Sequence, residues 1–194
     1  MKDDLFKNKY RRESIRLEGF DYGSNGAYFI TICSHNRIQA FSKIVSGEVL
    51  LTPLGAIIQE EWEKTSVIRD YVTTTDFVVM PDHLHGVIFI HKHADEPYGL
   101  PLYGNHVHFP EGYHNQFGPQ RKNLASIIRG FKSAVTQRAK IAGLSSTVWQ
   151  SNYYEHIIRN EREYERISSY IANNPARWQE DKTMPDYSDI IKAA

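Results

Sequence analysis

Cysteine is nearly absent from the sequence, since Cys33 is the only one among 194 residues. A single cysteine excludes an internal disulfide framework and a zinc site built from several thiolates. No apolar run reaches the length of a membrane span, and the polar start MKDDLFKNKYRRES does not resemble a secretory signal. From these absences we expect a soluble, cytoplasmic protein.

Net charge is also lacking, because 23 basic and 23 acidic side chains cancel. Taken alone, this balance argues against a nucleic-acid partner. However, residues 112–154 contain no Asp or Glu and carry six positive charges, on Arg121, Lys122, Arg129, Lys132, Arg138 and Lys140. Since phosphate binding depends on the local field, this segment is either a solvated helix face or a surface for nucleic acid.

Length and composition predict one globular domain over residues 1–194. The chain is 41% hydrophobic and 24% charged, which is ordinary for a soluble domain with a substantial core. Residues 92–119 are rich in Gly, Pro, His, Tyr and Asn without hydrophobic periodicity, so we expect a long exposed loop there. We expect residues 179–194 to form a peripheral tail.

The hydrophobic pattern predicts strands and helices in a mixed order. Strands are expected over 26–34, 71–80, 83–91 and within 147–159, and helices over 53–66, from 123 onward and over 160–174. Only Pro81 and Asp82 separate the second and third strands, so these two should form an antiparallel hairpin. The order predicts an α+β fold in which helices cover an antiparallel sheet, and it leaves the spatial order of the strands open.

The last predicted helix has clear boundary signals. Asn160 is a good N-cap, Glu163 stands at the capping-box position, and Pro175 is expected to end the helix.

His83 and His85 stand at the start of the third predicted strand. Because side chains alternate along a strand, both should point to one face, with Leu84 opposite. Two neutral imidazoles on one face can bind a single transition-metal ion. The chain has nine histidines, and the same spacing recurs in His91 with His93 and in His106 with His108. The spacing alone does not distinguish these three pairs. The position of His83 and His85 in a predicted strand favours them as the metal site.

Other histidine-based enzymes do not fit this sequence. A histidine-triad hydrolase would need a third histidine where Val87 stands, and an amidohydrolase barrel needs about 250 residues. No His-Glu-x-x-His zinc helix occurs. A two-histidine site that takes its third ligand from elsewhere remains.

Tyr170 and Asn174 lie four apart in the last helix, and therefore one above the other at the edge of its apolar stripe. A phenol beside a carboxamide suits a nucleophile next to an oxygen ligand. The alternative is that Tyr170 is a boundary tyrosine with its hydroxyl in water.

Three segments together resemble the REP-associated tyrosine transposases, bacterial members of the single-tyrosine HUH transposase superfamily. The segments are HLHGVIFI, IIRGFKSAV and WQSNYYEHIIRNEREYERISSYIANNPARW, and the resemblance extends from about Lys9 to Trp178. It implies a ferredoxin-like or RRM-like HUH endonuclease core. It also implies Tyr170 as the nucleophile, and His83, His85 and Asn174 as ligands of Mg²⁺ or Mn²⁺.

The resemblance further implies cleavage and rejoining of single-stranded DNA beside hairpin-forming palindromic repeats, through a 5′-phosphotyrosine intermediate. Our candidates for DNA contacts are basic residues: Arg11, Arg12, Arg121, Lys122, Arg129 and Lys132. A monomer is expected, with a dimer as the alternative. Two other functions stay open: a hairpin-DNA-binding protein without catalysis, and a small metal-dependent hydrolase without a covalent step.

Overall fold

A four-stranded antiparallel sheet lies at the centre of the structure, which is a computed structural model describing residues 22, 25–91 and 121–178. The strands are β1 (Gly26–Cys33), β4 (Val72–Val79), β5 (His83–Ile90) and β6 (Tyr154–Ile158). Their order is β4-β5-β1-β6, with every neighbouring pair antiparallel. The predicted hairpin between the second and third strands is therefore confirmed as β4–β5.

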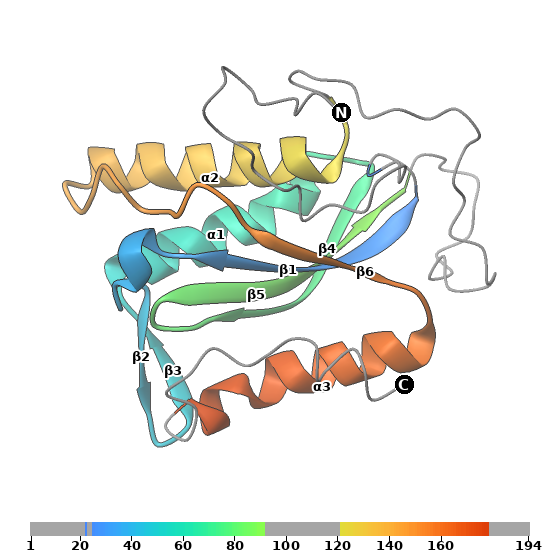
Figure 1. Cartoon of the computed structure of the whole chain (residues 1–194). Helices are drawn as coiled ribbons and strands as arrows, with labels where there is room; N and C mark the ends of the chain where they lie inside the picture. The colour runs from blue at the N-terminus through green and yellow to red at the C-terminus, as the bar shows by residue number, and fades with distance from the viewer. Residues whose placement is uncertain (1–21, 23–24, 92–120, 179–194) are drawn as a thin grey trace, which may run out of the picture.

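Helices cover both faces of the sheet (Figure 1). Helices α1 (Pro53–Val67) and α2 (Leu124–Ile141) lie on one face, and α3 (Glu161–Arg177) lies on the other. The predicted α+β architecture is confirmed. The predicted loop 92–119, the tail 179–194 and the Arg11–Arg12 pair lie outside the described residues. Within the described ranges, no helix has the length and apolar character that crossing a bilayer requires.

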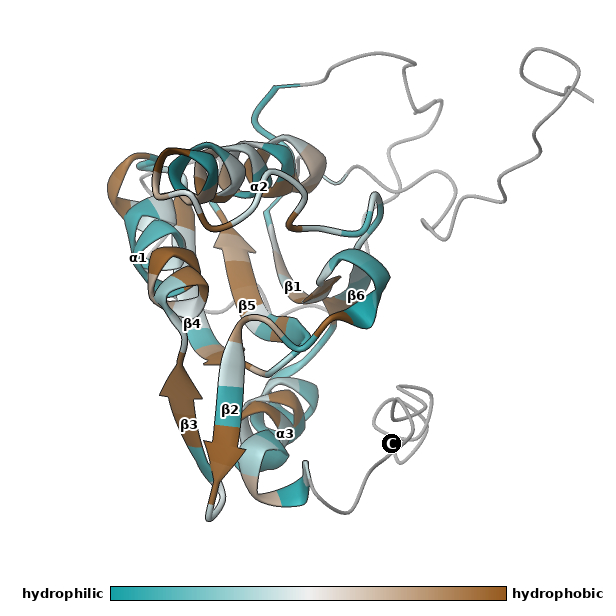
Figure 2. Cartoon of the chain, turned by 90° about the vertical axis from the view of Figure 1, so that its left-hand side faces the viewer, coloured by the Kyte–Doolittle hydropathy of each residue, from teal (hydrophilic) through white to brown (hydrophobic). Residues whose placement is uncertain are grey.

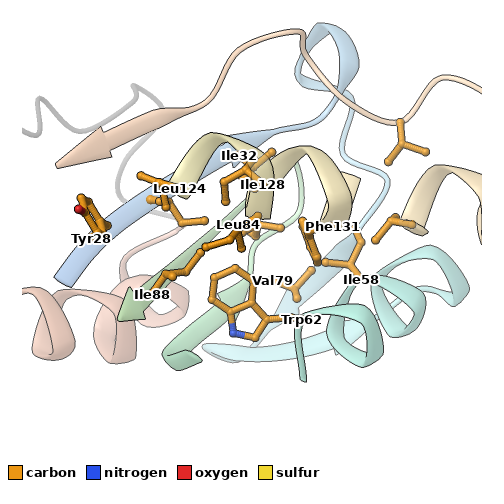
Figure 3. Packing of buried hydrophobic residues seen from close by; sticks show 14 of the residues in the cluster. Tyr28, Ile32, Ile58, Trp62, Val79, Leu84, Ile88, Leu124, Ile128 and Phe131 are labelled. Atoms are coloured by element: carbon orange, nitrogen blue, oxygen red, sulfur yellow. The ribbon is translucent and has the colours of Figure 1, made fainter. Parts of the chain in front are cut away.

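The two central strands, β1 and β5, are buried on both faces along their whole length. Tyr28, Ile30, Ile32, Leu84 and Ile88 point toward α1 and α2, where they pack in the larger core (Figure 3). The alternate residues point toward α3 and form a smaller core: Ala27, Phe29, Val87 and Phe89. The alternation thus places one half of each central strand, including His83 and His85, under α3.

Each α-helix begins at a side chain that caps its first turn. The Thr52 hydroxyl accepts a hydrogen bond from the Gly55 N–H, and Asn123 forms a capping box with Ser126. The predicted N-cap at Asn160 is confirmed, because its Oδ1 accepts from the Glu163 N–H at 2.8 Å. These caps satisfy N–H groups that the helix itself leaves unpaired.

Two boundary predictions for α3 are wrong. The helix passes through Pro175 and ends at Arg177, since a proline so close to the helix end removes only one of its hydrogen bonds. The capping box does not form either. The Glu163 carboxylate accepts from the Arg159 N–H at 2.6 Å, rather than from the N-cap residue.

A second, two-stranded sheet was not predicted. Strands β2 (Ser42–Val45) and β3 (Glu48–Leu51) form a hairpin that projects beside the C-terminal end of α3 (Figures 1 and 2). Its turn residues Ser46 and Gly47 have φ values of 53° and 79°, as a primed hairpin turn requires. Each strand has only four residues, too few for a clear alternation of polar and apolar residues. A serine is also an uncommon residue for the left-handed conformation of Ser46.

Gly86 permits the closest approach between a helix and the sheet. A Cβ at this position would lie 2.4 Å from Cζ2 of Trp62. The Trp62 indole is itself held by Phe77, whose ring it stacks on at 4.7 Å, and by the edge of Phe131. The absence of a side chain at Gly86 therefore lets α1 pack against the strand that carries the two histidines.

We expect Gly86→Ala to lower the free energy of unfolding by about 1–3 kcal/mol, because the added methyl overpacks the Trp62 contact. Urea denaturation followed by circular dichroism measures this change. The matched control is Gly130→Ala in α2, where the Cβ would meet only the end of the Arg69 side chain and a helix interior gains up to about 1 kcal/mol. Equal midpoints for the two variants would contradict the packing argument.

Candidate active site

His83 and His85 lie side by side on the face of β5 that α3 covers. Their side chains are buried, at 4% and 0% exposure, and Leu84 between them points into the opposite core. In the register of the sheet, His83 pairs with Cys33 and His85 pairs with Thr31 of β1. The predicted same-face arrangement is therefore present, inside the protein rather than at an exposed strand end.

Each histidine is anchored through its Nδ1 nitrogen. His83 Nδ1 lies 2.7 Å from Oδ1 of Asp82, and the other carboxylate oxygen pairs with Arg37 Nε at 3.0 Å. His85 Nδ1 lies 2.8 Å from the hydroxyl oxygen of Thr31. Because a carboxylate paired with arginine only accepts, His83 Nδ1 carries the hydrogen and its Nε2 keeps a lone pair. A carboxylate behind a histidine is the usual support of a metal-binding imidazole.

The two Nε2 nitrogens face each other at 3.0 Å. Without a cation, this contact requires His85 to donate its Nε2 hydrogen to His83, while Thr31 donates to His85 Nδ1. If a cation were bound, both Nε2 lone pairs would be available to it, and His85 Nδ1–H would donate to Thr31. The two Nε2 nitrogens are close enough together to serve as ligands of one ion.

Burial keeps both imidazoles neutral. Loss of hydration lowers the pKa of His83, although the hydrogen bond to Asp82 acts in the opposite direction. Burial, together with the charges of His83 and Arg37, lowers the pKa of His85 well below its ordinary value. Neutral imidazole is the form that binds metal ions.

Tyr170 of α3 reaches this pair of histidines. Its hydroxyl oxygen lies 3.3 Å from His85 Nε2, and the two ring centroids are 5.3 Å apart. The edge of Phe29 packs against the tyrosine ring at 6.2 Å. The structure thus brings together three of the predicted site residues, which are up to 87 positions apart in the chain (170 − 83).

Asn174 follows one helical turn after Tyr170 and is 9% exposed. Its carboxamide forms no hydrogen bond with another residue of the described chain. Within residues 22, 25–91 and 121–178, no group of three His, Cys, Asp or Glu side chains gathers to hold a metal. Among the described residues, a third protein ligand would therefore be of another type, and the Asn174 carboxamide lies on the same helix as Tyr170.

Two polar contacts fix α3 to opposite edges of the sheet. Asp76, at an irregularity in β4, accepts hydrogen bonds from Tyr164 and Ser168, both at 2.6 Å. On the other edge, Glu163 binds His156 of β6 at 2.8 Å. These contacts determine the position of the helix and therefore of Tyr170.

Two further residues continue the row formed by Tyr170 and Asn174, namely Arg166 in α3 and Trp178 directly after its end. Arg166, one turn before Tyr170, has buried Nε and Nη1 atoms that make no hydrogen bond within the described chain. Trp178, one turn after Asn174, places its ring centroid 5.9 Å from that of His83. The sequence analysis missed both, although their spacing of four residues from predicted site residues was a usable signal.

The residues behind the histidines were also missed. Asp82 and Arg37 support His83, and Thr31 supports His85. The one available signal was that Asp82 immediately precedes His83, which the sequence analysis interpreted only as part of a turn.

The predicted DNA-contacting residues of the basic segment lie elsewhere. Arg121, Lys122 and Arg129 are exposed, at or near α2, on the opposite face of the sheet from α3 (Figure 1). Lys132 is directed at backbone carbonyl groups, with its ammonium 2.6 Å from the Gln150 oxygen. Burial lowers the pKa of Lys132 to about 8. The structure does not bring these four residues to Tyr170.

Comparison with known proteins gives two informative matches, although no family model matches the chain. A protein of Haemophilus influenzae, described as uncharacterized, is 38% identical over 177 residues, covering 91% of this chain and 95% of the relative. The chain belongs to the family of this Haemophilus protein. The second match is a solved structure of a REP-associated tyrosine transposase bound to a REP hairpin, with a TM-score of 0.51 and 21% identity.

The likeness to the transposase structure covers 95% of this chain and 86% of that chain. At this identity it establishes a shared fold, and it agrees with the α+β architecture predicted from the sequence.

We expect the contact between Glu163 and His156 to make stability depend on pH. Burial raises the pKa of the Glu163 carboxyl, but the hydrogen bonds from His156 and from the Arg159 N–H outweigh burial, so the pKa lies below its ordinary value of 4.5. A carboxylate with a lowered pKa stabilises the fold above pH 4.5, and this contribution disappears as the pH falls through the lowered value.

Glu163→Gln should therefore be less stable than the original protein at neutral pH, and the difference should shrink in acid. Urea midpoints at about pH 7 and about pH 3 measure it. The control is Glu165→Gln, an exposed glutamate on the same helix, which should change little. A difference for Glu163→Gln that grows toward acid pH would contradict this assignment.

Proposed function

We propose that this protein cleaves and rejoins single-stranded DNA beside hairpin-forming repeats, by forming a covalent bond between Tyr170 and a 5′ phosphate. The observation that carries the proposal is the Tyr170 hydroxyl at 3.3 Å from Nε2 of His85, beside the paired histidines. A phenol at a prepared metal site suits attack on a phosphodiester. The solved structure with the same fold is a transposase bound to a DNA hairpin, which supports DNA as the substrate class.

His83, His85 and Asn174 would hold a divalent metal ion, Mg²⁺ or Mn²⁺. The neutral imidazoles and their Nδ1 anchors support this assignment. Imidazole nitrogens together with a carboxamide oxygen suit Mn²⁺ at least as well as Mg²⁺. When bound, such an ion neutralises charge on the phosphodiester and polarises its phosphorus.

Tyr170 supplies the nucleophile. Its phenolic oxygen forms a bond to phosphorus as the bond from phosphorus to the 3′ oxygen breaks, while the phenol loses a proton and the departing 3′ oxygen gains one. The phosphotyrosine ester conserves the energy of the broken bond, so a 3′ hydroxyl can reverse the reaction without ATP. Arg166 lies one helical turn before Tyr170 and carries a positive charge on the same helix.

Tyr170→Phe should abolish covalent attachment to DNA while leaving DNA binding nearly unchanged, because only the hydroxyl is removed. The test incubates end-labelled hairpin DNA carrying single-stranded flanks with the protein and Mn²⁺, and then separates the products on a denaturing gel. The matched control is Tyr164→Phe on the same helix, which loses one hydrogen bond to Asp76 while Ser168 keeps the other. This control should still form the adduct.

The same gel, together with a native gel shift that measures hairpin binding, separates the alternatives. Cleaved DNA without an adduct, unaffected by Tyr170→Phe, would indicate a metal-dependent hydrolase. Hairpin binding by the unsubstituted protein with neither cleavage nor adduct would indicate a binding protein without catalysis.

Asp82→Asn should weaken Mn²⁺ binding by about 10- to 100-fold, because the carboxylate orients His83 and makes its Nε2 more basic. Titration calorimetry with Mn²⁺ on the full chain measures the affinity without any DNA. The control is Asp70→Asn, an exposed aspartate outside the site, which should bind Mn²⁺ normally. Equal Mn²⁺ affinities for the two variants would show that Asp82 does not support metal binding.

A further inference from the structure

Trp178 stands beside the candidate metal site. Its ring centroid lies 5.9 Å from that of His83, at an interplanar angle of 43°. It follows Tyr170 and Asn174 at intervals of four residues, so the three side chains form one row along α3. The indole therefore lies beside the histidine pair, at the C-terminal end of α3.

The other two tryptophans have structural roles that Trp178 lacks. Trp62 is 3% exposed and stacks on Phe77 in the larger core. Trp149 donates its indole N–H to the Lys132 carbonyl oxygen at 3.1 Å and packs against Phe41. Trp178, in contrast, is half-buried and belongs to neither hydrophobic cluster of the described residues. A large partly exposed ring beside reactive groups is suited to binding a flat, apolar surface of a ligand.

We propose that Trp178 stacks on an unpaired base next to the phosphate that Tyr170 attacks. The proposal rests on the proposed DNA cleavage and specifies its substrate further. Every nucleobase has a π-face that can stack on an aromatic ring. A base inside a duplex is already covered on both faces, so a stacking position here selects a nucleotide whose strand is single at the cleavage point.

The positions of the neighbouring groups agree with this role. His83 lies between the two aromatic side chains, since its Nε2 is 3.0 Å from His85, which Tyr170 contacts, and its ring is beside Trp178. A phosphate held at the histidines would thus have the nucleophile on one side and the indole on the other. The base attached to such a nucleotide is the group nearest to Trp178.

Tryptophan fluorescence tests the contact directly. Titration with single-stranded oligothymidylate is performed on the full chain carrying Tyr170→Phe, so that no cleavage interferes. We expect quenching in this protein and in its Trp149→Phe derivative, and its loss in the Trp178→Phe derivative. A purely structural Trp178 would leave the quenching unchanged when it is replaced, and that result would overturn the proposal.

Affinity provides the second measurement. By fluorescence anisotropy, Trp178→Ala should weaken binding of a labelled single strand by about 5- to 150-fold and leave blunt duplex binding unchanged. Trp178→Phe retains a ring and should recover most of the affinity. Equal losses for single strand and duplex, or no loss for either, would overturn the proposal.

The outcome is separable from that of the proposed function. If the unsubstituted protein binds single strands with Trp178-dependent quenching yet forms no adduct, the cleavage chemistry fails and the stacking stands. If the adduct forms and single-strand affinity is independent of Trp178, only the stacking fails.

Discussion

The packing of α3 against the β1–β5 face of the sheet is the interaction on which the rest of the site depends. The two histidines are close together because both belong to β5. The phenol of Tyr170 contacts them only because α3 is held at a particular position along its own axis, relative to the sheet. A shift of one helical turn would move the hydroxyl by about 5.4 Å and break its 3.3 Å contact with His85. Asp76 of β4 on one edge and His156 of β6 on the other, which binds Glu163 of α3, prevent that shift. Apolar packing of Ile167 and Ile171 holds the helix down, while these directional contacts determine its register.

The polar groups buried in this site are paired with one another. The Nδ1 nitrogens of both histidines have partners, and the Asp82 carboxylate is shared between His83 and Arg37. The Nε2 nitrogens instead face each other at 3.0 Å. Pairing of buried polar atoms avoids a cost in free energy, and Tyr170 reaches the same point, with its hydroxyl 3.3 Å from His85 Nε2. Arg166 differs, because its Nε and Nη1 atoms are buried without a hydrogen-bond partner in the described chain.

The basic segment illustrates how local composition differs from a binding surface. Its positive charges are distributed over several environments once the chain is folded. Arg138 pairs with Glu60 and Glu61 of α1 at 2.6 and 2.8 Å, and Lys132 binds backbone carbonyls. Arg121, Lys122 and Arg129 remain exposed on the α2 face. Residues 112–154 contain no acidic side chain, but Glu60 and Glu61, which are distant in sequence, neutralise part of their positive charge.

The sequence by itself determined the features that depend on short-range periodicity. Strand alternation placed His83 and His85 on one face, helical spacing aligned Tyr170 with Asn174, and Asn160 marked the start of α3, because each involves residues at most four apart. Only the tertiary structure decided the strand order, the unpredicted β2–β3 hairpin, the continuation of α3 through Pro175, and the supporting roles of Thr31 and Asp76. The strand order and the roles of Thr31 and Asp76 arise from contacts between segments far apart in the chain. The β2–β3 hairpin and the continuation through Pro175 are local, but they depend on backbone conformations that the hydrophobic pattern does not record.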